Sequence, residues 1–318
     1  MSLLGALGAI SAYFRFDLAY RFLRRMPAYN RRELIWRIMA DEHVDSACFR
    51  TNGFTWHVPM KLGLPLELFR SGDFQGQEVD ALCEWIGHHG LLQAGRDTII
   101  DVGANLGTTS VPIARRLGCR ILAVEPAPLN LRFLEENLRA NGCAAQVTVA
   151  PRAVLREPGV IQLLLPTDDP GGYCVDRGTV RAGLSEQALN SLVEARADRL
   201  DAIALESGVS VDQVALVWSD TQGCEAEVME TGVEFWSRGA PFYTEIEPLS
   251  LRRQGALDTF AGLAGRYFDR YIEAKDIVAR RGAAPTHPIA EFAALLNGLP
   301  ADATVDVLFL PGNCRLKG

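Results

Sequence analysis

The sequence lacks an excess of positive charge, paired cysteines and a secretory signal. Its 318 residues hold 32 Lys and Arg against 39 Asp and Glu, a formal net charge of -7, so nucleic acid is not an expected partner. Seven cysteines without a CxxC pair argue against a zinc or disulfide framework and favour reduced thiols in a cytoplasmic protein.

Metal-ligand spacing is also absent. The five histidines are dispersed along the chain and form no ligand pattern. The acids Asp168 and Asp169 stand before Pro-Gly, a context more typical of a turn than of a metal site. We therefore predict no obligatory metal.

No long uncharged hydrophobic run opens the chain. The segment MSLLGALGAISAYFRFDLAYRFLRRM is interrupted by Arg15, Asp17 and Arg21, and its basic residues follow the apolar part rather than precede it. We expect an amphipathic helix without stable membrane insertion. It belongs to a mostly helical N-terminal extension or cap, residues 1–77, which is a candidate region for substrate contact or for a homodimer interface.

Short apolar runs alternate with helical patterns over the remaining residues, 78–318. The predicted strands cover residues 98–102, 120–124, 146–150, 214–219, 241–246, 267–273 and 304–309. This alternation predicts an α/β, Rossmann-like fold with a seven-stranded, mostly parallel sheet and helices on both faces. Residues 151–211 interrupt the rhythm, and we expect a hairpin or a mobile loop there, over the sheet edge.

The turn after the first predicted strand reads DVGANLG. In a doubly wound sheet this turn approaches the ligand most closely, and Gly103 and Gly107 remove side chains that would prevent the approach. The turn lacks the GxGxxG of a pyrophosphate loop, and Asp101 would repel a phosphate but suit an ammonium group. Asp101 as a simple helix cap is the structural alternative.

A second acid, Glu125, ends the next predicted strand, 24 positions after Asp101 (125 minus 101). An acid at this place typically accepts hydrogen bonds from the hydroxyls of a ribose. Its structural alternative is a solvated strand end. An amino group and a ribose without a phosphate together describe S-adenosylmethionine.

Four segments carry a resemblance to a known family. IIDVGANLG, AVEPAPLNLRFLEENLRANG, VTVAPRAVLREPG and WSDTQGCEAEVMETG resemble motifs of the FkbM family of class I S-adenosylmethionine-dependent methyltransferases, and the likeness runs from about Glu78 to the C-terminus. The last segment resembles a family hallmark close to KIDVEGAE. Trp218 and Gln222 replace its common lysine and glutamate.

The resemblance implies the fold described above and S-adenosylmethionine as the cofactor. The residues expected to hold the cofactor are Asp101, Gly103, Ala104, Asn105, Gly107, Thr108, Glu125, Pro126, Ala153 and Asp220.

Three acids are candidates for catalysis. Asp220 follows the fourth predicted strand, Glu225 lies on the entering helix, and Glu245 ends the next strand. A hydroxyl acceptor benefits from a general base, which a carboxylate can supply. Strand-end acids also cap helices or pair with arginines, and Glu225 fits a first helical turn. Three aromatic residues either line an acceptor pocket or pack in the core: Phe54, Tyr173 and Trp218.

Together these patterns predict O-methylation of a hydroxyl on a small molecule such as a sugar, a polyketide or another secondary metabolite, in a biosynthetic role. Three alternatives stay open. An N-methyltransferase would share the fold. A non-catalytic cofactor-binding module is suggested by Trp218, and a nicotinamide-dependent dehydrogenase would share the sheet and the strand-end acid.

Overall fold

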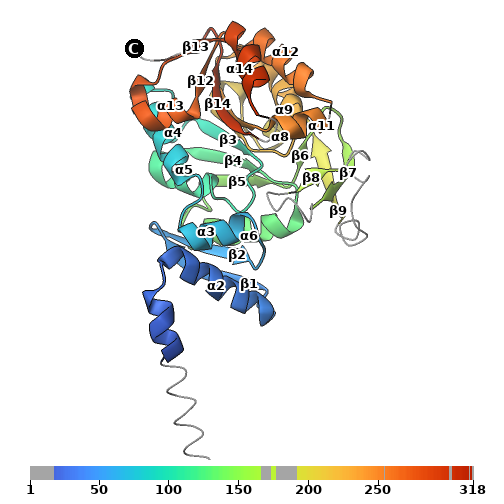
Figure 1. Cartoon of the computed structure of the whole chain (residues 1–318). Coiled ribbons are helices and arrows are strands. Elements are labelled where there is room, and N and C mark those ends of the chain that lie inside the picture. Colours follow the sequence, from blue (N-terminus) through green and yellow to red (C-terminus); the bar gives the residue numbers. More distant parts are fainter. Residues whose placement is uncertain are drawn as a thin grey trace, which may run out of the picture.

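A computed structural model describes residues 18–165, 173–176, 192–253, 255–300, 303–314 and 316. Its centre is an eight-stranded sheet of order β13-β12-β14-β11-β10-β3-β4-β5 (Figure 1). The strands are β3 (Thr98–Val102), β4 (Arg120–Val124), β5 (Val147–Ala150), β10 (Val214–Ser219), β11 (Phe242–Ile246), β12 (Arg270–Glu273), β13 (His287–Pro288) and β14 (Val305–Leu310). The mostly parallel α/β sheet predicted from the sequence is confirmed.

Two details of the sheet differ from the prediction. The two-residue strand β13 pairs antiparallel with β12 and makes eight strands instead of seven. Strand β12 begins at Arg270 rather than at residue 267, because α12 (Leu257–Tyr267) occupies the preceding residues. Strand β14 runs antiparallel between β11 and β12, while β5, β4, β3, β10 and β11 are parallel neighbours.

Helices cover both faces of this sheet, as predicted. One face packs against α4 (Gly76–His89), α5 (Ser110–Leu117), α6 (Pro128–Ala140) and α13 (Ala274–Arg280). The other packs against α8 (Leu200–Glu206), α9 (Glu225–Thr231), α10 (Val233–Ser237), α11 (Pro248–Arg253), α12 and α14 (Phe292–Gly298). Strand β3 is buried along its whole length, as expected for a strand between two helical layers.

The N-terminal region is less helical than expected. Between α2 (Ala28–Asp41) and α3 (Leu64–Ser71) lies an antiparallel hairpin of β1 (Ser46–Thr51) and β2 (Phe54–Pro59). Asn52 and Gly53 form its turn with φ of 50° and 81°, the left-handed conformation that tight hairpins require. The Asn-Gly pair was the signal for this hairpin in the sequence.

Two asparagines, one in α6 and one directly after it, attach this hairpin to the sheet domain. The Asn137 amide accepts from His57 N at 2.6 Å and donates to His57 O at 3.1 Å. The Asn141 amide does the same with the backbone of Thr55, at 2.9 and 2.7 Å. Trp56 and Val58 then share one buried cluster with residues of the sheet. The predicted boundary at residue 77 stays a prediction, and the two sides of it share a core.

The segment predicted as a hairpin or loop contains a second sheet of order β6-β9-β7-β8. Its strands are β6 (Ala153–Val154), β7 (Gly159–Leu164), β8 (Cys174–Val175) and β9 (Val193–Asp198). Asp168 and Asp169 lie outside the described residues.

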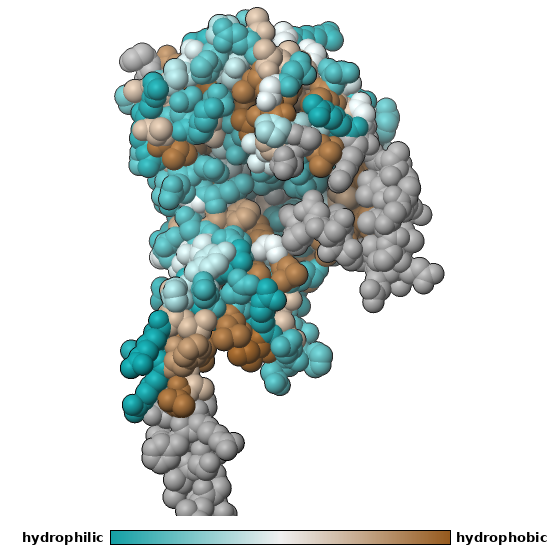
Figure 2. Space-filling model, in the orientation of Figure 1, coloured by the Kyte–Doolittle hydropathy of each residue, from teal (hydrophilic) through white to brown (hydrophobic). Residues whose placement is uncertain are grey.

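Exposed hydrophobic residues cluster on the N-terminal region, over α2 and the helical residues 18–25 (Figure 2). Leu18 and Phe22 are exposed there. In the described part of the chain, no helix combines the length and the apolar character needed to cross a bilayer.

Candidate active site

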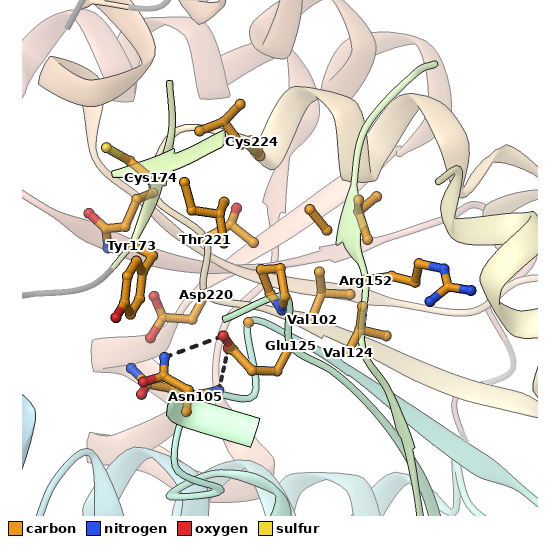
Figure 3. A pocket seen from close by; sticks show the side chains of 18 of the residues that line it. Val102, Asn105, Val124, Glu125, Arg152, Tyr173, Cys174, Asp220, Thr221 and Cys224 are labelled. Carbon is orange, nitrogen blue, oxygen red and sulfur yellow. Dashed lines mark hydrogen bonds between the residues drawn. The ribbon is translucent and has the colours of Figure 1, made fainter. Parts of the chain in front are cut away.

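A cavity of about 870 Å³, open solvent at its mouth included, lies at the carboxyl ends of β3, β4 and β10 (Figure 3). Seven of the residues predicted to bind cofactor line it: Gly103, Asn105, Thr108, Glu125, Pro126, Ala153 and Asp220. The other candidates, Asp101, Ala104, Gly107, Glu225 and Glu245, lie outside this lining. The cavity thus gathers residues from four separate segments of the chain.

The turn between β3 and α5 brings two strand ends into contact. Gly103 has φ of +83°, and a Cβ atom placed on it would lie 1.9 Å from the carbonyl oxygen of Asp220. The Asp220 N–H in turn donates to Val102 O at 2.9 Å. Only glycine fits at position 103, because a side chain would collide with backbone rather than with a movable group.

Glu125 is the best-satisfied acid of the cavity. Its carboxylate accepts from Asn105 N at 2.9 Å, from Ala127 N at 2.8 Å and from the Asn130 amide at 3.3 Å. Figure 3 marks hydrogen bonds of this group beside Asn105. Burial raises the pKa of Glu125 to about 7, although these donors oppose the shift. Asn105 has φ of 48°, a left-handed conformation that asparagine adopts more readily than most residues.

Asp101 lies beneath the turn rather than on the cavity wall. It is 1% exposed, and its carboxylate accepts a short hydrogen bond from the Ser110 hydroxyl at the start of α5. Burial raises its pKa to about 7, with Asp220 and Glu125 adding repulsion. Its predicted contact with an ammonium group of the cofactor stays a prediction.

Ala104 and Gly107 of the turn pack against the rest of the protein. Ala104 is buried in the core on the α5 face of the sheet. Gly107 has φ of +86°, and a Cβ atom there would lie 2.8 Å from the Leu134 side chain, so glycine allows the turn to pack on α6. Thr108, Pro126 and Ala153 contribute to the cavity wall.

Asp220 and Glu245 form a pair of hydrogen-bonded carboxyl groups. Asp220 also has a side-chain hydrogen bond with Gln75, just before α4. Burial raises the pKa of both acids, that of Glu245 to about 9, and the negative charge of Asp220 adds to the shift of Glu245. Two acids that share a proton suit proton transfer at neutral pH.

Glu225 holds the turn that follows Asp220. Its Oε1 accepts from Gly223 N and from the Thr221 hydroxyl, both at 3.1 Å. Glu225 is 1% exposed, and burial raises its pKa to about 8. Its position favours ordering of residues 220–223 over contact with an acceptor.

Sequence reasoning missed several cavity residues. Leu64 and Phe74 come from the N-terminal region, Asn130 from α6, and Thr221 and Cys224 from the turn after β10. Asn130 lies five positions after Glu125 on a predicted helix start, a signal that local spacing could have given. Leu64 and Phe74 carry no such signal, because their contact depends on the docking of the hairpin.

The three aromatic candidates have different locations in the structure. Tyr173 lines the cavity. Trp218 is buried and stacks on Tyr243 with ring centroids 4.1 Å apart, so it is a core residue. Phe54 lies against Trp56 in the hairpin.

One group of side chains meets the spacing of a metal site within the described ranges. Ligand atoms of Glu273, Asp276 and His287 lie within 4.8 Å of one another at the far edge of the sheet. Glu273 also pairs with Lys275, and His287 Nε2 lies 4.0 Å from Asp276 Oδ2. None of these residues lines the cavity.

Comparison with solved structures finds matches at low sequence identity and with TM-scores below 0.5. A geranyl diphosphate C-methyltransferase from Streptomyces coelicolor A3(2) matches with TM-score 0.38 and 13% identity, over 79% of this chain and 80% of that one. TYW2 from P. horikoshii matches with TM-score 0.41 and 11% identity, over 89% and 81%. The aTrm5 protein in complex with tRNALeu matches with TM-score 0.42 and 12% identity, over 84% and 53%. No curated protein matches the chain.

The family comparison is decisive. Residues 101–270, more than half of the chain, match the methyltransferase FkbM domain. The match begins at the acid that ends β3 and includes both Glu125 and Asp220. S-adenosylmethionine is therefore the cofactor, as the turn after β3 predicted. The chain belongs to the FkbM family of S-adenosylmethionine-dependent methyltransferases.

Proposed function

We propose that the protein transfers a methyl group from S-adenosylmethionine to a hydroxyl oxygen of a small molecule. The observation that carries this proposal is the position of Asp220, a half-buried acid on the wall of the cavity and hydrogen-bonded to a second acid, Glu245. A small acceptor, rather than a nucleic acid, agrees with the net charge of -7 and with the acids at this end of the cavity.

The cavity fits the cofactor in charge and in shape. Glu125 lies where the ribose hydroxyls would donate, and Ala153, Val154 and Leu163 give an apolar wall suited to an adenine ring. Gly103 leaves room for close backbone approach. When bound, S-adenosylmethionine supplies an electrophilic methyl group on a positively charged sulfur.

The protein's own part is to align the acceptor and to take its proton. Asp220, in the carboxylate form, accepts the hydroxyl proton of the acceptor as the oxygen becomes a nucleophile. Glu245, whose pKa is raised to about 9 by burial and by the charge of Asp220, keeps its proton and donates a hydrogen bond to Asp220, which orients the base. Glu225 fixes the turn that carries Asp220 through Thr221 and Gly223.

An N-methyltransferase is the second candidate, because an amine acceptor would also lose a proton to Asp220. A dehydrogenase receives less support, since the DVGANLG turn lacks a pyrophosphate loop and the chain belongs to a methyltransferase family. In a cofactor-binding module without catalysis, the Asp220–Glu245 pair would have no function.

The test is Asp220→Asn. The amide keeps the shape of the side chain but cannot act as a base, so we expect methyl transfer to fall about 100- to 10,000-fold, the usual contribution of general acid–base catalysis. Binding of S-adenosylhomocysteine should stay within about threefold, less than the effect of one lost hydrogen bond.

Transfer is followed with tritiated S-adenosylmethionine on mixtures of hydroxylated and aminated metabolites, and the product bond is assigned by NMR. Products methylated on nitrogen alone would overturn the hydroxyl assignment. Full activity in Asp220→Asn would remove Asp220 as the base.

A further inference from the structure

Three neighbouring strands each place an acid in one row, which begins at Asp220 on the cavity wall. Glu245 of β11 lies directly opposite Asp306 of β14 in the antiparallel register. Asp220 follows the β10 residue Ser219, whose partner Thr244 precedes Glu245. The three acids therefore stand in one row across the sheet, and Asp220 joins this row to the cavity wall.

Helix α4 adds a fourth acid to the row. The charge of Glu78 acts on Asp306, and that of Asp220 acts on both Glu78 and Asp306, so these carboxyl groups interact electrostatically. Burial raises the pKa of Glu78 and brings that of Asp306 to about 7. In the part of the chain that the structure describes, no Lys or Arg forms an ion pair with any of the four.

An unpartnered hydroxyl points to the same place. Tyr243 is 1% exposed, stands two residues before Glu245 on the same face of β11, and its hydroxyl has no hydrogen-bond partner. All four acids, Asp306, Glu78, Asp220 and Glu245, act on this hydroxyl electrostatically. A buried hydroxyl without a partner indicates a group that a ligand would satisfy.

The spacing of the row distinguishes between two kinds of cation. A metal ion needs ligand atoms that converge, and within the described ranges only Glu273, Asp276 and His287 reach that spacing. The row is spread over three strands and a helix instead. Carboxylates that approach from separate elements suit an ammonium group, whose N–H donors point in several directions.

We infer that the acceptor carries a cationic nitrogen, held by Glu78, Glu245, Asp306 and the Tyr243 hydroxyl, beside the hydroxyl that Asp220 deprotonates. An amino alcohol such as an amino sugar has this chemistry. The inference rests on the proposed function, since it assigns one more part of the same acceptor. The ammonium donates to the carboxylates of Glu78 and Asp306, to the carbonyl oxygen of protonated Glu245 and to the Tyr243 oxygen, and its charge offsets the repulsion within the row.

The experiment compares two probes of equal length on the full chain loaded with S-adenosylhomocysteine: putrescine, which carries ammonium groups, and 1,4-butanediol, which carries hydroxyls. NMR titration at low ionic strength gives both affinities. We expect putrescine to bind at least about tenfold more tightly, the effect of one charge-assisted hydrogen bond. Equal affinities would overturn the inference.

Variants locate the binding. Asp306→Asn and the double variant Glu245→Gln/Asp306→Asn should lose about tenfold or more in putrescine affinity. The matched control Glu135→Gln/Glu234→Gln removes two exposed acids elsewhere and should lose little. Equal losses in both double variants would mean general attraction to an acidic protein and would refute the site.

Folding and cofactor binding are checked separately. Melting temperature shows whether each variant folds. If the double variant does not fold, the affinity of Asp306→Asn alone decides the test. Failure of the wild type to bind S-adenosylhomocysteine would count against the proposed function. Normal cofactor binding without preference for putrescine would count against the cationic acceptor alone.

Discussion

The acids at the two ends of the cavity differ in their hydrogen-bond partners. At the cofactor end, Glu125 accepts hydrogen bonds from two backbone N–H groups and from Asn130. At the acceptor end, Asp220 and Glu245 bond to each other, and Asp306 faces them across the sheet. The first arrangement is preformed within the chain and leaves the carboxylate able to accept from a ligand. The second has the charge and the free hydroxyl that a ligand would complete, and this difference separates a preformed cofactor site from a site that selects its acceptor.

The largest effect on cofactor affinity is expected at Gly103, where the ends of β3 and β10 touch. In Gly103→Ala the new Cβ would lie 1.9 Å from Asp220 O, so both strand ends must move apart. Strain at positive φ of about 1–2 kcal/mol adds to this collision, and together they should lower affinity for S-adenosylhomocysteine about 100-fold. Calorimetric titration measures the change.

The control for this substitution is Gly118→Ala. Gly118 also has positive φ, +61°, but no atom lies within 4 Å of the added Cβ. It should lose about 1–2 kcal/mol of stability with cofactor affinity unchanged. Equal losses of affinity in both variants would show that strain alone, and not contact between the two ends, matters at Gly103.

A smaller effect is expected in the dependence of stability on pH. Burial raises the pKa of Glu125 to about 7 and that of Glu245 to about 9, from 4.5 for a free glutamate. Between 4.5 and these values the folded chain binds more protons than the unfolded chain, so stability falls as pH rises.

The two ends should therefore lose stability over different pH ranges. Glu125 contributes from about pH 4.5 to 7 and Glu245 from about pH 4.5 to 9, whereas Glu225 contributes up to about pH 8. Glu245→Gln should therefore flatten the fall above pH 8, while Glu125→Gln leaves it. Thermal melts of the cofactor-free protein between pH 5 and pH 9 measure this. A fall above pH 8 that persists in Glu245→Gln would contradict the assignment of a proton to that acid.

The sequence predicted what depends on neighbouring residues. Glu125 bonds to Asn105, Ala127 and Asn130, all in segments where the strand-turn-helix pattern is continuous, and the seven strands followed from the same pattern. The family resemblance correctly identified the methyltransferase domain.

What the sequence did not predict depends on distant segments. Gln75 and Glu78 reach Asp220 only because the N-terminal hairpin and α4 pack on the sheet, and Asp306 faces Glu245 only because β14 runs antiparallel beside β11. Asp101, predicted to bind the cofactor, lies outside the cavity lining, and the Ser110 hydroxyl at the start of α5 donates to its carboxylate. Its contact with the cofactor stays a prediction. A local pattern of alternating strands and helices contains none of these contacts.

The central claim is that this cavity binds S-adenosylmethionine through Glu125. Calorimetric titration of the wild type with S-adenosylmethionine, S-adenosylhomocysteine and NADH tests it, with Glu125→Gln and Glu245→Gln beside it. We expect the first two ligands to bind and NADH not to bind. We also expect about a tenfold loss in Glu125→Gln, from replacing a charged acceptor, and little change in Glu245→Gln. Binding of NADH alone, or equal losses in both variants, would contradict the account.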